Sequence, residues 1–342
     1  MSLLAGLFFR LHHLHHKIIG IASAAASAAL FCSCSAVGNT ASSQSFVFDT
    51  YSQVTVCGSD SEDVLSEVES ILSEISAGFE LCYDMTAAEL PQNRLYSDCL
   101  SKTHELNRRY GNGINVFCGK LTKLWGISAE SPKVPADEEI AAVLAELPDA
   151  LTETITPGAM LDFGAVSKGY ACDKVFEILE KNDTKDIDYG IISLSSTTLM
   201  YGKKPGGKPF RTGLTNPLTG EGYAGIIETE AAFISTSGGY ERFFSPEGTD
   251  DKYCHIMDMT TGRPVETDLA SATVIVPADV PDGGILSDFL ATMIFSEGTE
   301  NIDKWLACED FRVTAVSADG GVYSNCEGLE LNESGGFYYE YK

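Results

Sequence analysis

The sequence predicts an α+β fold built as a single large domain. Segments of alternating apolar and polar residues interleave with segments of helical periodicity, and they do so without the strict repeat of a doubly wound sheet. The chain has 342 residues, 44% of them hydrophobic, which is enough to bury a large core. No internal repeat and no long Pro/Gly-rich break divides the chain.

The charge balance excludes two classes of partner. The chain has 23 Lys and Arg against 49 Asp and Glu, a net charge of −26. A protein that grips a nucleic-acid backbone, or a polybasic segment that adheres to anionic lipid, needs clustered cations. We therefore expect neither nucleic-acid binding nor electrostatic binding to a membrane surface.

The first 33 residues read as a lipoprotein signal peptide. Residues 1–17 contain Arg10 and Lys17 but no acid, and residues 18–31 form an apolar run that is short for a membrane-spanning helix. The run ends in LFCSCSA, where Cys34 follows a small residue and Cys32 follows phenylalanine. We expect lipidation at Cys34, with Cys32 and an uncleaved anchor as alternatives. Either way the chain is expected on the extracytoplasmic face of a bacterial cell membrane, tethered to it.

The next segments predict a tether, a strand and a helix. Residues 34–45 are small and polar, as in a flexible tether, so the folded domain is expected over residues 46–342. Residues 45–58 alternate and end at a glycine, which predicts one strand. Residues 60–78 then show helical spacing of Val, Leu and Ile.

The remaining elements follow from the same two periodicities. Residues 80–120 show no clear pattern. Helices are expected at residues 137–147, from the turn after Asp162 to about residue 181, at 286–295 and at 301–310. Strands are expected at 189–202, 270–278, 311–318 and 320–325, with further short strands within 222–236.

The first candidate site is the turn that opens the central helix. Asp162 precedes Gly164, which lets backbone approach a ligand closely, and Lys168 follows one turn into the helix. Free N–H groups at a helix start, together with a lysine, suit phosphate oxygens. A simple helix cap with an exposed lysine is the alternative.

His255 is the second candidate. Four of the six histidines lie in the first 16 residues, which leaves His104 and His255 and excludes a multi-histidine metal site in the folded domain. Imidazole is the ordinary group for removing a hydroxyl proton, and the nearby Asp258 can orient it. A buried structural histidine is the alternative.

The third candidate is the segment SDFLATMIF. Asp288 and Thr292 stand at i and i+4, hence on one helix face. A carboxylate, a hydroxyl and a carbonyl from elsewhere would be oxygen ligands for Mg²⁺ or Ca²⁺. An aspartate at a helix start is also a common cap.

Taken together, these motifs resemble one known family. LDFGAVSKGYACD, ISTSGGYERFF, HIMDMTTGRP and SDFLAT, in this order behind a lipoprotein signal, are similar to the ApbE family of FAD:protein FMN transferases. KLWGI at 123–127 and the proline-led segment at 135–150 extend the likeness, which covers roughly residues 45–340. The resemblance implies an ApbE-like fold, with mixed or antiparallel sheets packed by helices.

The resemblance also implies an activity and a set of roles. Family members use Mg²⁺ to split FAD and transfer FMN through its phosphate to a Ser or Thr of a target flavoprotein, releasing AMP. FAD would thus be the substrate and the flavoprotein the partner. By this likeness the roles fall to residues of the motifs: Phe48, Trp125, Gly126, Ile127, Asp162, Lys168 and Met257 contact FAD, the carbonyl of Ala165 with Asp288 and Thr292 binds the metal, and His255 beside Asp258 is the base.

The chain departs from the family pattern in three places. Ser195, Ser196 and Thr197 stand where a Gly-Gly-Asn turn is usual, Met259 stands where a proline follows the aspartate, and residues 80–105 match poorly. Side chains replace glycine where backbone normally comes close. Two alternatives therefore stay open: a Mg²⁺-dependent FAD pyrophosphatase, and a non-catalytic flavin-binding lipoprotein.

Overall fold

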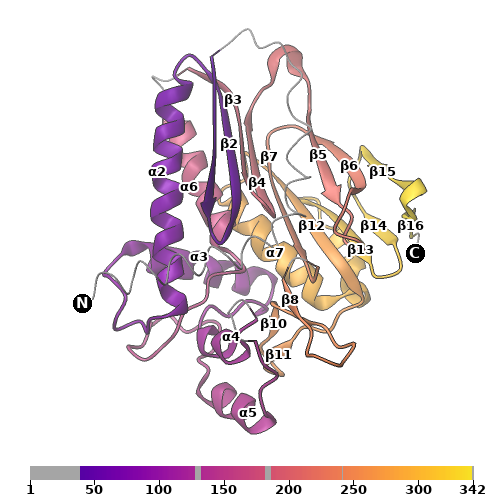
Figure 1. Ribbon diagram of the computed structural model, residues 1–342. Helices are drawn as coiled ribbons and strands as arrows, with labels where there is room; N and C mark the ends of the chain where they lie inside the picture. Colours follow the sequence, from indigo (N-terminus) through magenta and orange to yellow (C-terminus); the bar gives the residue numbers. More distant parts are fainter. Residues whose placement is uncertain (1–38, 128–131, 182–185, 241, 341–342) are drawn as a thin grey trace.

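A nine-stranded sheet forms the centre of the molecule in the computed structural model, which describes residues 39–127, 132–181, 186–240 and 242–340. Its strand order is β1-β2-β3-β4-β7-β12-β13-β14-β16 (Figure 1). Neighbouring strands are antiparallel except β14 and β16, which are parallel. The predicted α+β class with mixed sheets is confirmed.

The sheet contains β1 (Thr40–Val47), β2 (Thr50–Gly58), β3 (Ile187–Leu194), β4 (Thr197–Gly202), β7 (Ala232–Gly238), β12 (Leu269–Pro277), β13 (Arg312–Ser317), β14 (Gly321–Ser324) and β16 (Tyr338–Tyr339). The other strands are β5 (Phe210–Thr215), β6 (Tyr223–Thr229), β8 (Phe243–Phe244), β9 (Tyr253–Cys254), β10 (Met257–Asp258), β11 (Arg263–Pro264) and β15 (Leu329–Leu331). The helices are α2 (Ser61–Glu80), α3 (Arg94–Tyr110), α4 (Gly119–Trp125), α5 (Asp137–Glu146), α6 (Ser167–Lys181), α7 (Gly283–Glu297) and α8 (Ile302–Leu306).

Helices cover one face of the sheet. Figure 1 shows α2 running alongside the β1–β2 hairpin, with α6 and α7 beside it. Every residue of α7 from Gly283 to Phe295 is buried, so this helix is the centre of the main core. A helix that is apolar on nearly all sides is typical of such a buried position. The opposite face is covered in part by the small sheet β15-β6-β5.

A second, smaller core lies at the lower end of the molecule in Figure 1, where α4 and α5 meet β10 and β11. Its buried side chains are Leu121, Trp125, Ile140 and Met257. This core fixes the segment that contains His255 against two helices.

Two predicted strands are hairpins. The segment 45–58 turns at Phe48 and Asp49, whose φ angles of 53° and 54° give the two-residue loop typical of antiparallel hairpins. The segment 189–202 turns at Ser195 and Ser196, which separate β3 from β4. Neither turn contains the Gly or Asn that normally marks such a loop.

Two further expectations need correction. Residues 40–45 were expected within a flexible tether over 34–45, but they pair with β2 as part of β1; residues 34–38, and Cys34 with them, lie outside the described residues. Helix α3 lies in the stretch that showed no pattern. Its buried face includes Thr103, His104 and Asn107, and these polar residues interrupt the apolar stripe.

Across the described ranges, none of the helices combines the length and apolar character needed to cross a membrane.

Candidate active site

The site is built on the crossing of α6 and α7. Their backbones touch at two glycines: a Cβ atom on Gly169 would lie 2.2 Å from the Gly284 carbonyl oxygen, and a Cβ on Gly284 would lie 2.3 Å from that of Gly169. Asp173 of α6 accepts hydrogen bonds from the first N–H groups of α7, those of Gly284 (2.7 Å) and Ile285 (2.8 Å). Because a helix start leaves such donors unpaired, this carboxylate fixes α7 against α6.

Asp288 is deeply buried at this crossing, with 3% of its surface exposed. Its Oδ2 accepts a hydrogen bond from the N–H of Gly169 at 2.9 Å. Burial raises its pKa, although the charge of Lys168 and the Gly169 N–H act in the opposite direction. Thr292 lies one turn further along α7, and its hydroxyl donates to the Asp288 carbonyl oxygen at 3.2 Å.

The residues at this point fit a divalent cation. A buried carboxylate with a raised pKa is stabilised by a nearby positive charge, and Asp288 and Thr292 offer the hard oxygen atoms that Mg²⁺ prefers. No group of three or more His, Cys, Asp or Glu side chains in the described ranges could hold a metal. A cation here would therefore keep several water or substrate oxygens as ligands, as Mg²⁺ commonly does.

His255 lies in the link between β9 and β10. Its Nδ1 is 3.2 Å from the backbone oxygen of Arg242, and its own N–H donates to the same oxygen. Because a carbonyl oxygen only accepts, Nδ1 must carry the proton, which leaves Nε2 as the acceptor of the neutral ring. Burial, together with the charges of Arg242 and Lys168, lowers the pKa of His255 to about 4, although the hydrogen bond to the Arg242 carbonyl acts in the opposite direction.

The structure does not bring the Asp258 carboxylate to His255. Asp258 instead accepts hydrogen bonds from the N–H of Thr260 (2.8 Å) and the hydroxyl of Thr261 (2.9 Å), so it closes its own turn. The ring of His255 is oriented by the Arg242 carbonyl. Asp258 with Thr260, Thr261 and Gly262 following Met259 is the local signal for this turn.

Asp162 lies in the turn before α6. Asp162 accepts the N–H of Gly164 at 2.8 Å and therefore caps its own turn. Its negative charge is the main cause of the raised pKa of the half-exposed Tyr83, on which Asp49 and Arg242 also act. Arg242 donates to the Asp49 carbonyl oxygen at 3.1 Å. The β1–β2 hairpin tip, with Phe48 beside Asp49, thus adjoins both the Asp162 turn and the His255 segment.

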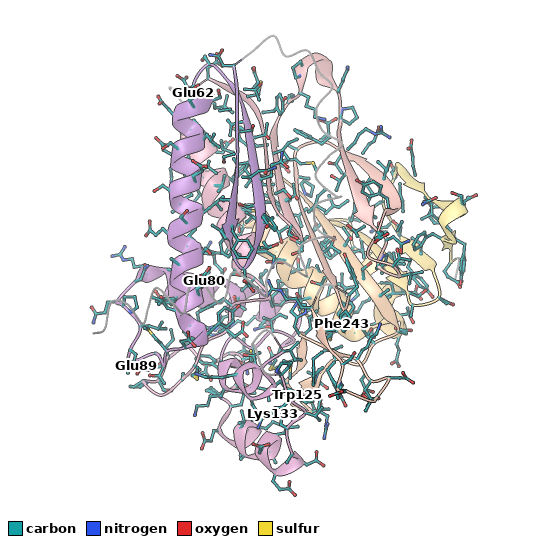
Figure 2. All side chains as sticks on the ribbon, viewed as in Figure 1. Glu62, Glu80, Glu89, Trp125, Lys133 and Phe243 are labelled. Carbon is teal, nitrogen blue, oxygen red and sulfur yellow. The ribbon has the colours of Figure 1, made fainter. Side chains whose placement is uncertain are left out.

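Trp125 is fully buried at the end of α4, near the base of the molecule in Figure 2. Its indole N–H donates to the Gly262 carbonyl oxygen at 2.8 Å, and Met257 and Ile127 pack in the same small core. Gly126 ends α4 in the left-handed conformation, with φ of 61°. In this structure the tryptophan ring connects α4 to the turn after His255.

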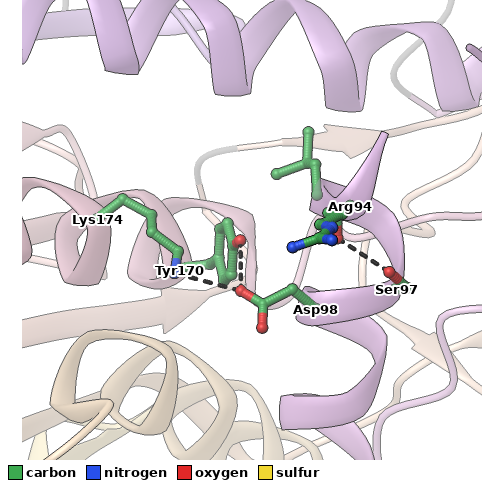
Figure 3. Close-up of a pocket in the computed structure, with 6 residues that line it drawn as sticks. Arg94, Ser97, Asp98, Tyr170 and Lys174 are labelled. Atoms are coloured by element: carbon green, nitrogen blue, oxygen red, sulfur yellow. Dashed lines mark hydrogen bonds and ion pairs between the residues drawn. The ribbon is translucent and has the colours of Figure 1, made fainter. Parts of the chain in front are cut away.

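A hollow of about 490 Å³ lies between α3 and α6 (Figure 3). Asp98 accepts a hydrogen bond there from Tyr170 at 2.7 Å and pairs with Lys174 at 3.3 Å. Arg94 and Ser97 also line it. None of the sequence-predicted site residues lines this hollow, so it is separate from the Asp288 and His255 groups.

The structure links Asp288 with Thr292 by a hydrogen bond and both Asp288 and His255 with Lys168 by charge, whereas Trp125, Ile127 and Met257 share the small core. Lys168 acts electrostatically on both Asp288 and His255, which are far apart in sequence. Sequence reasoning missed Arg242 and Tyr83, and their neighbours in the chain give no signal beyond the ERFF motif. It also missed Asp173, although an aspartate on the buried side of a helix was a usable sign.

Comparison with known proteins agrees with this architecture. The ApbE family model matches residues 48–316. The FAD:protein FMN transferase of Escherichia coli K12 is 25% identical over 214 residues, which are 57% of this chain and 60% of that protein. The chain thus matches less than two thirds of this relative's length.

Solved structures show the same fold. An ApbE protein from Thermotoga maritima superposes with a TM-score of 0.69 at 19% identity, over 88% of this chain and all of that one. The Pseudomonas stutzeri flavinyl transferase ApbE gives 0.67 at 21% identity, over 84% and 95%. The motifs, the fold and the family match coincide on the same residues, and the chain belongs to the ApbE family.

Proposed function

We propose that this chain is a Mg²⁺-dependent FAD:protein FMN transferase, which attaches FMN through its phosphate to a Ser or Thr hydroxyl of a target flavoprotein and releases AMP. Family membership supports the reaction class. The observation that carries the proposal is the placement of Lys168, whose charge acts on both the buried Asp288 and His255. Phosphoryl transfer depends on positioning and on neutralising charge, and a cation that acts on both a proposed metal-binding carboxylate and a proposed base suits it.

The proposed metal ligands are Asp288, Thr292 and the carbonyl oxygen of Ala165. A bound Mg²⁺ would neutralise charge on the pyrophosphate of FAD. Lys168 adds a second positive charge beside it. This matters because the whole chain has a net charge of −26 and would otherwise repel a polyphosphate.

His255 is the proposed base. Its Nε2 is the free acceptor of the neutral ring, and its lowered pKa keeps it unprotonated at neutral pH. In the reaction the acceptor hydroxyl oxygen bonds to the phosphorus of the FMN moiety, and the bond from that phosphorus to the AMP phosphate oxygen breaks. The hydroxyl proton passes to His255 Nε2, and AMP leaves with the electron pair.

The flavin contacts are proposals that follow from the family resemblance. Asp162 and Lys168 flank the start of α6, and Phe48 lies at the hairpin tip beside the Asp49 to Arg242 contact. Trp125, Gly126, Ile127 and Met257 would define the flavin end from the small core under the His255 segment.

The test is an incubation of the chain with FAD, Mg²⁺ and a purified flavoprotein domain, followed by separation of the products. We expect AMP to form in equal amount to a covalent flavin adduct on the acceptor. Free FMN with AMP and no adduct would favour the pyrophosphatase alternative. FAD binding without any turnover would favour the non-catalytic alternative.

The altered turn supports an active site rather than a degenerate one. Ser195 adopts φ of 63°, the conformation in which glycine is usual, and Thr197 lies within hydrogen-bonding distance of Asp288. The turn therefore keeps a compatible backbone despite the loss of two glycines.

We also propose that the chain is anchored to the extracytoplasmic face of a bacterial cell membrane through a lipid on Cys34. The support is the apolar run and LFCSCSA motif of residues 18–36. Labelling cells with a fatty-acid analogue should mark the wild type and Cys32→Ser but not Cys34→Ser. Equal labelling of both variants would refute the choice of cysteine.

A further inference from the structure

Thr197 is the first residue of β4 and is completely buried. Its hydroxyl donates to Oδ1 of Asp288 at 3.3 Å, while Oδ2 of the same carboxylate accepts the N–H of Gly169 at 2.9 Å. The two oxygens of Asp288 are therefore bound by donors from two different elements, β4 and α6. A carboxylate bound on both oxygens cannot rotate freely about its Cβ–Cγ bond.

A chain of buried hydroxyl groups supports the Thr197 hydroxyl from behind. Ser235 of β7 stands opposite Thr197 in the sheet, and its hydroxyl lies 3.3 Å from Thr197 Oγ1. Ser235 also lies 2.8 Å from the hydroxyl of Ser287, which is within donor distance of the Gly284 carbonyl oxygen, and both serines are fully buried. Ser235 therefore donates its one proton either to Thr197 or to Ser287. Because a carboxylate only accepts, the single proton of Thr197 goes to Asp288 in either case.

We propose that Thr197 is a positioning residue, which fixes the orientation of the Asp288 carboxylate for a divalent cation. The inference rests on the proposed function in one respect, the assignment of Asp288 as a metal ligand. Groups that orient a metal ligand from behind commonly contribute strongly to metal affinity, because they remove the freedom that the ligand would otherwise lose on binding. None of the predicted site residues included Thr197 in this role.

The test is the affinity for Mn²⁺, measured by the electron paramagnetic resonance of the free ion in the absence and presence of FAD. Thr197→Val keeps the shape of the side chain and removes the hydroxyl. We expect its Mn²⁺ dissociation constant to rise about tenfold or more. Thr197→Ser keeps the hydroxyl and should stay within about threefold of the wild type.

Thr314→Val is the matched control. Thr314 is a strand residue with 1% exposure whose hydroxyl bonds to Ser324 at 2.8 Å, and β12 and β7 separate its strand, β13, from β4. Its loss should cost similar stability and leave Mn²⁺ affinity unchanged. If Thr197→Val does not fold, Ser235→Ala removes the hydroxyl behind Thr197 and should weaken Mn²⁺ binding by a smaller factor.

The outcomes separate the inference from the proposed function. If the wild type binds Mn²⁺ and removal of the Thr197 hydroxyl, or of the Ser235 hydroxyl where Thr197→Val does not fold, leaves the affinity unchanged, Thr197 does not position Asp288 and the inference is wrong. If Thr314→Val weakens Mn²⁺ binding as much as Thr197→Val, the effect is general destabilisation and the inference is also wrong. If the wild type binds no Mn²⁺ even with FAD, the metal assignment of the proposed function fails, and the inference fails with it.

Discussion

At the residue scale, burial shifts the pKa values of two side chains in the candidate site. Asp288 has a raised pKa and His255 a lowered one, and burial is the main cause of both. Opposite shifts of an acid and a base in one site are common where proton transfer and charge neutralisation occur together. The two residues could be singled out from the sequence, but the burial that shifts their pKa values could not be predicted from it.

The pH dependence of turnover tests the role of His255. A base must be unprotonated, and the pKa of about 4 keeps His255 in that form throughout the neutral range. At saturating Mg²⁺, kcat/KM for AMP release should stay level as the pH falls to about 5 and decline near pH 4. A decline centred near 6.5, the value of an unperturbed histidine, would contradict this environment.

Ser195 is a strained residue in the turn between β3 and β4. Its φ of 63° lies in the left-handed region, which costs a residue with a Cβ atom about 1–2 kcal/mol. Ser195→Gly should therefore raise the free energy of unfolding by about 1 kcal/mol in urea denaturation. Ser196→Gly is the control, because φ of Ser196 lies outside that region; it should be neutral or destabilising. A destabilised Ser195→Gly variant would mean that the serine side chain contributes more than the strain costs.

Residues within local motifs of the candidate site could be predicted from the sequence, whereas contacts between distant residues could not. Lys168, Asp288, Thr292 and His255 could be singled out as candidates because their motifs are local. The hydrogen bond from Thr197 to Asp288 joins residues 91 positions apart and depends on strand register, which no local pattern encodes. The expected pairing of Asp258 with His255 failed because a shorter-range turn with Thr260 and Thr261 competes for the same carboxylate.

At the scale of elements, the crossing of α6 and α7 determines where the site residues lie. Two glycines let the helices touch, and Asp173 binds the start of α7. The long helix α2 was predictable, because its periodicity is regular, and it matches its expected range closely, whereas α3 was not, because buried polar residues interrupt its apolar stripe. The two hairpins were not predictable either, because Phe48-Asp49 and Ser195-Ser196 lack turn-forming glycine, although Phe48, Asp49 and Ser195 adopt left-handed φ angles.

The close contact between α6 and α7 predicts that a methyl group added at Gly169 lowers the stability of the fold. A Cβ on residue 169 would lie 2.2 Å from the Gly284 oxygen, so Gly169→Ala must push the helices apart. We expect it to lower the free energy of unfolding by about 1–3 kcal/mol or more. Gly158→Ala, where no atom lies within 4 Å of the added methyl, should stay within about 0.5 kcal/mol of the wild type. Equal stability of the two variants in urea denaturation would contradict the close contact.

At the scale of the whole molecule, the domain is larger at its start than the sequence indicated. β1 begins at Thr40 and pairs with β2 along its length, and Ala41 and Val47 are buried against the core. Polar, small residues in an edge strand look like a linker, because one side of the strand faces solvent and the ladder hydrogen bonds are made by backbone. Composition alone cannot distinguish a linker from an edge strand of this kind.

Truncation tests this boundary. A chain that starts at residue 39 keeps the whole of β1, whereas one that starts at residue 46 loses most of it. We expect the shorter chain to be less stable by about 2 kcal/mol or more, since several backbone hydrogen bonds are lost. Urea denaturation of both chains measures the difference. Equal midpoints would show that residues 40–45 add nothing to the fold.

The central claim is that this acidic chain moves FMN from FAD onto a hydroxyl of another protein. The most direct test is the intact mass of an acceptor flavoprotein produced together with the chain, followed by fragmentation to locate the modified residue. We predict a gain of one FMN less one water on a single Ser or Thr, and no gain when the chain bears Asp288→Ala. An unmodified acceptor alongside free FMN and AMP, or full modification by the Asp288→Ala variant, would contradict the account.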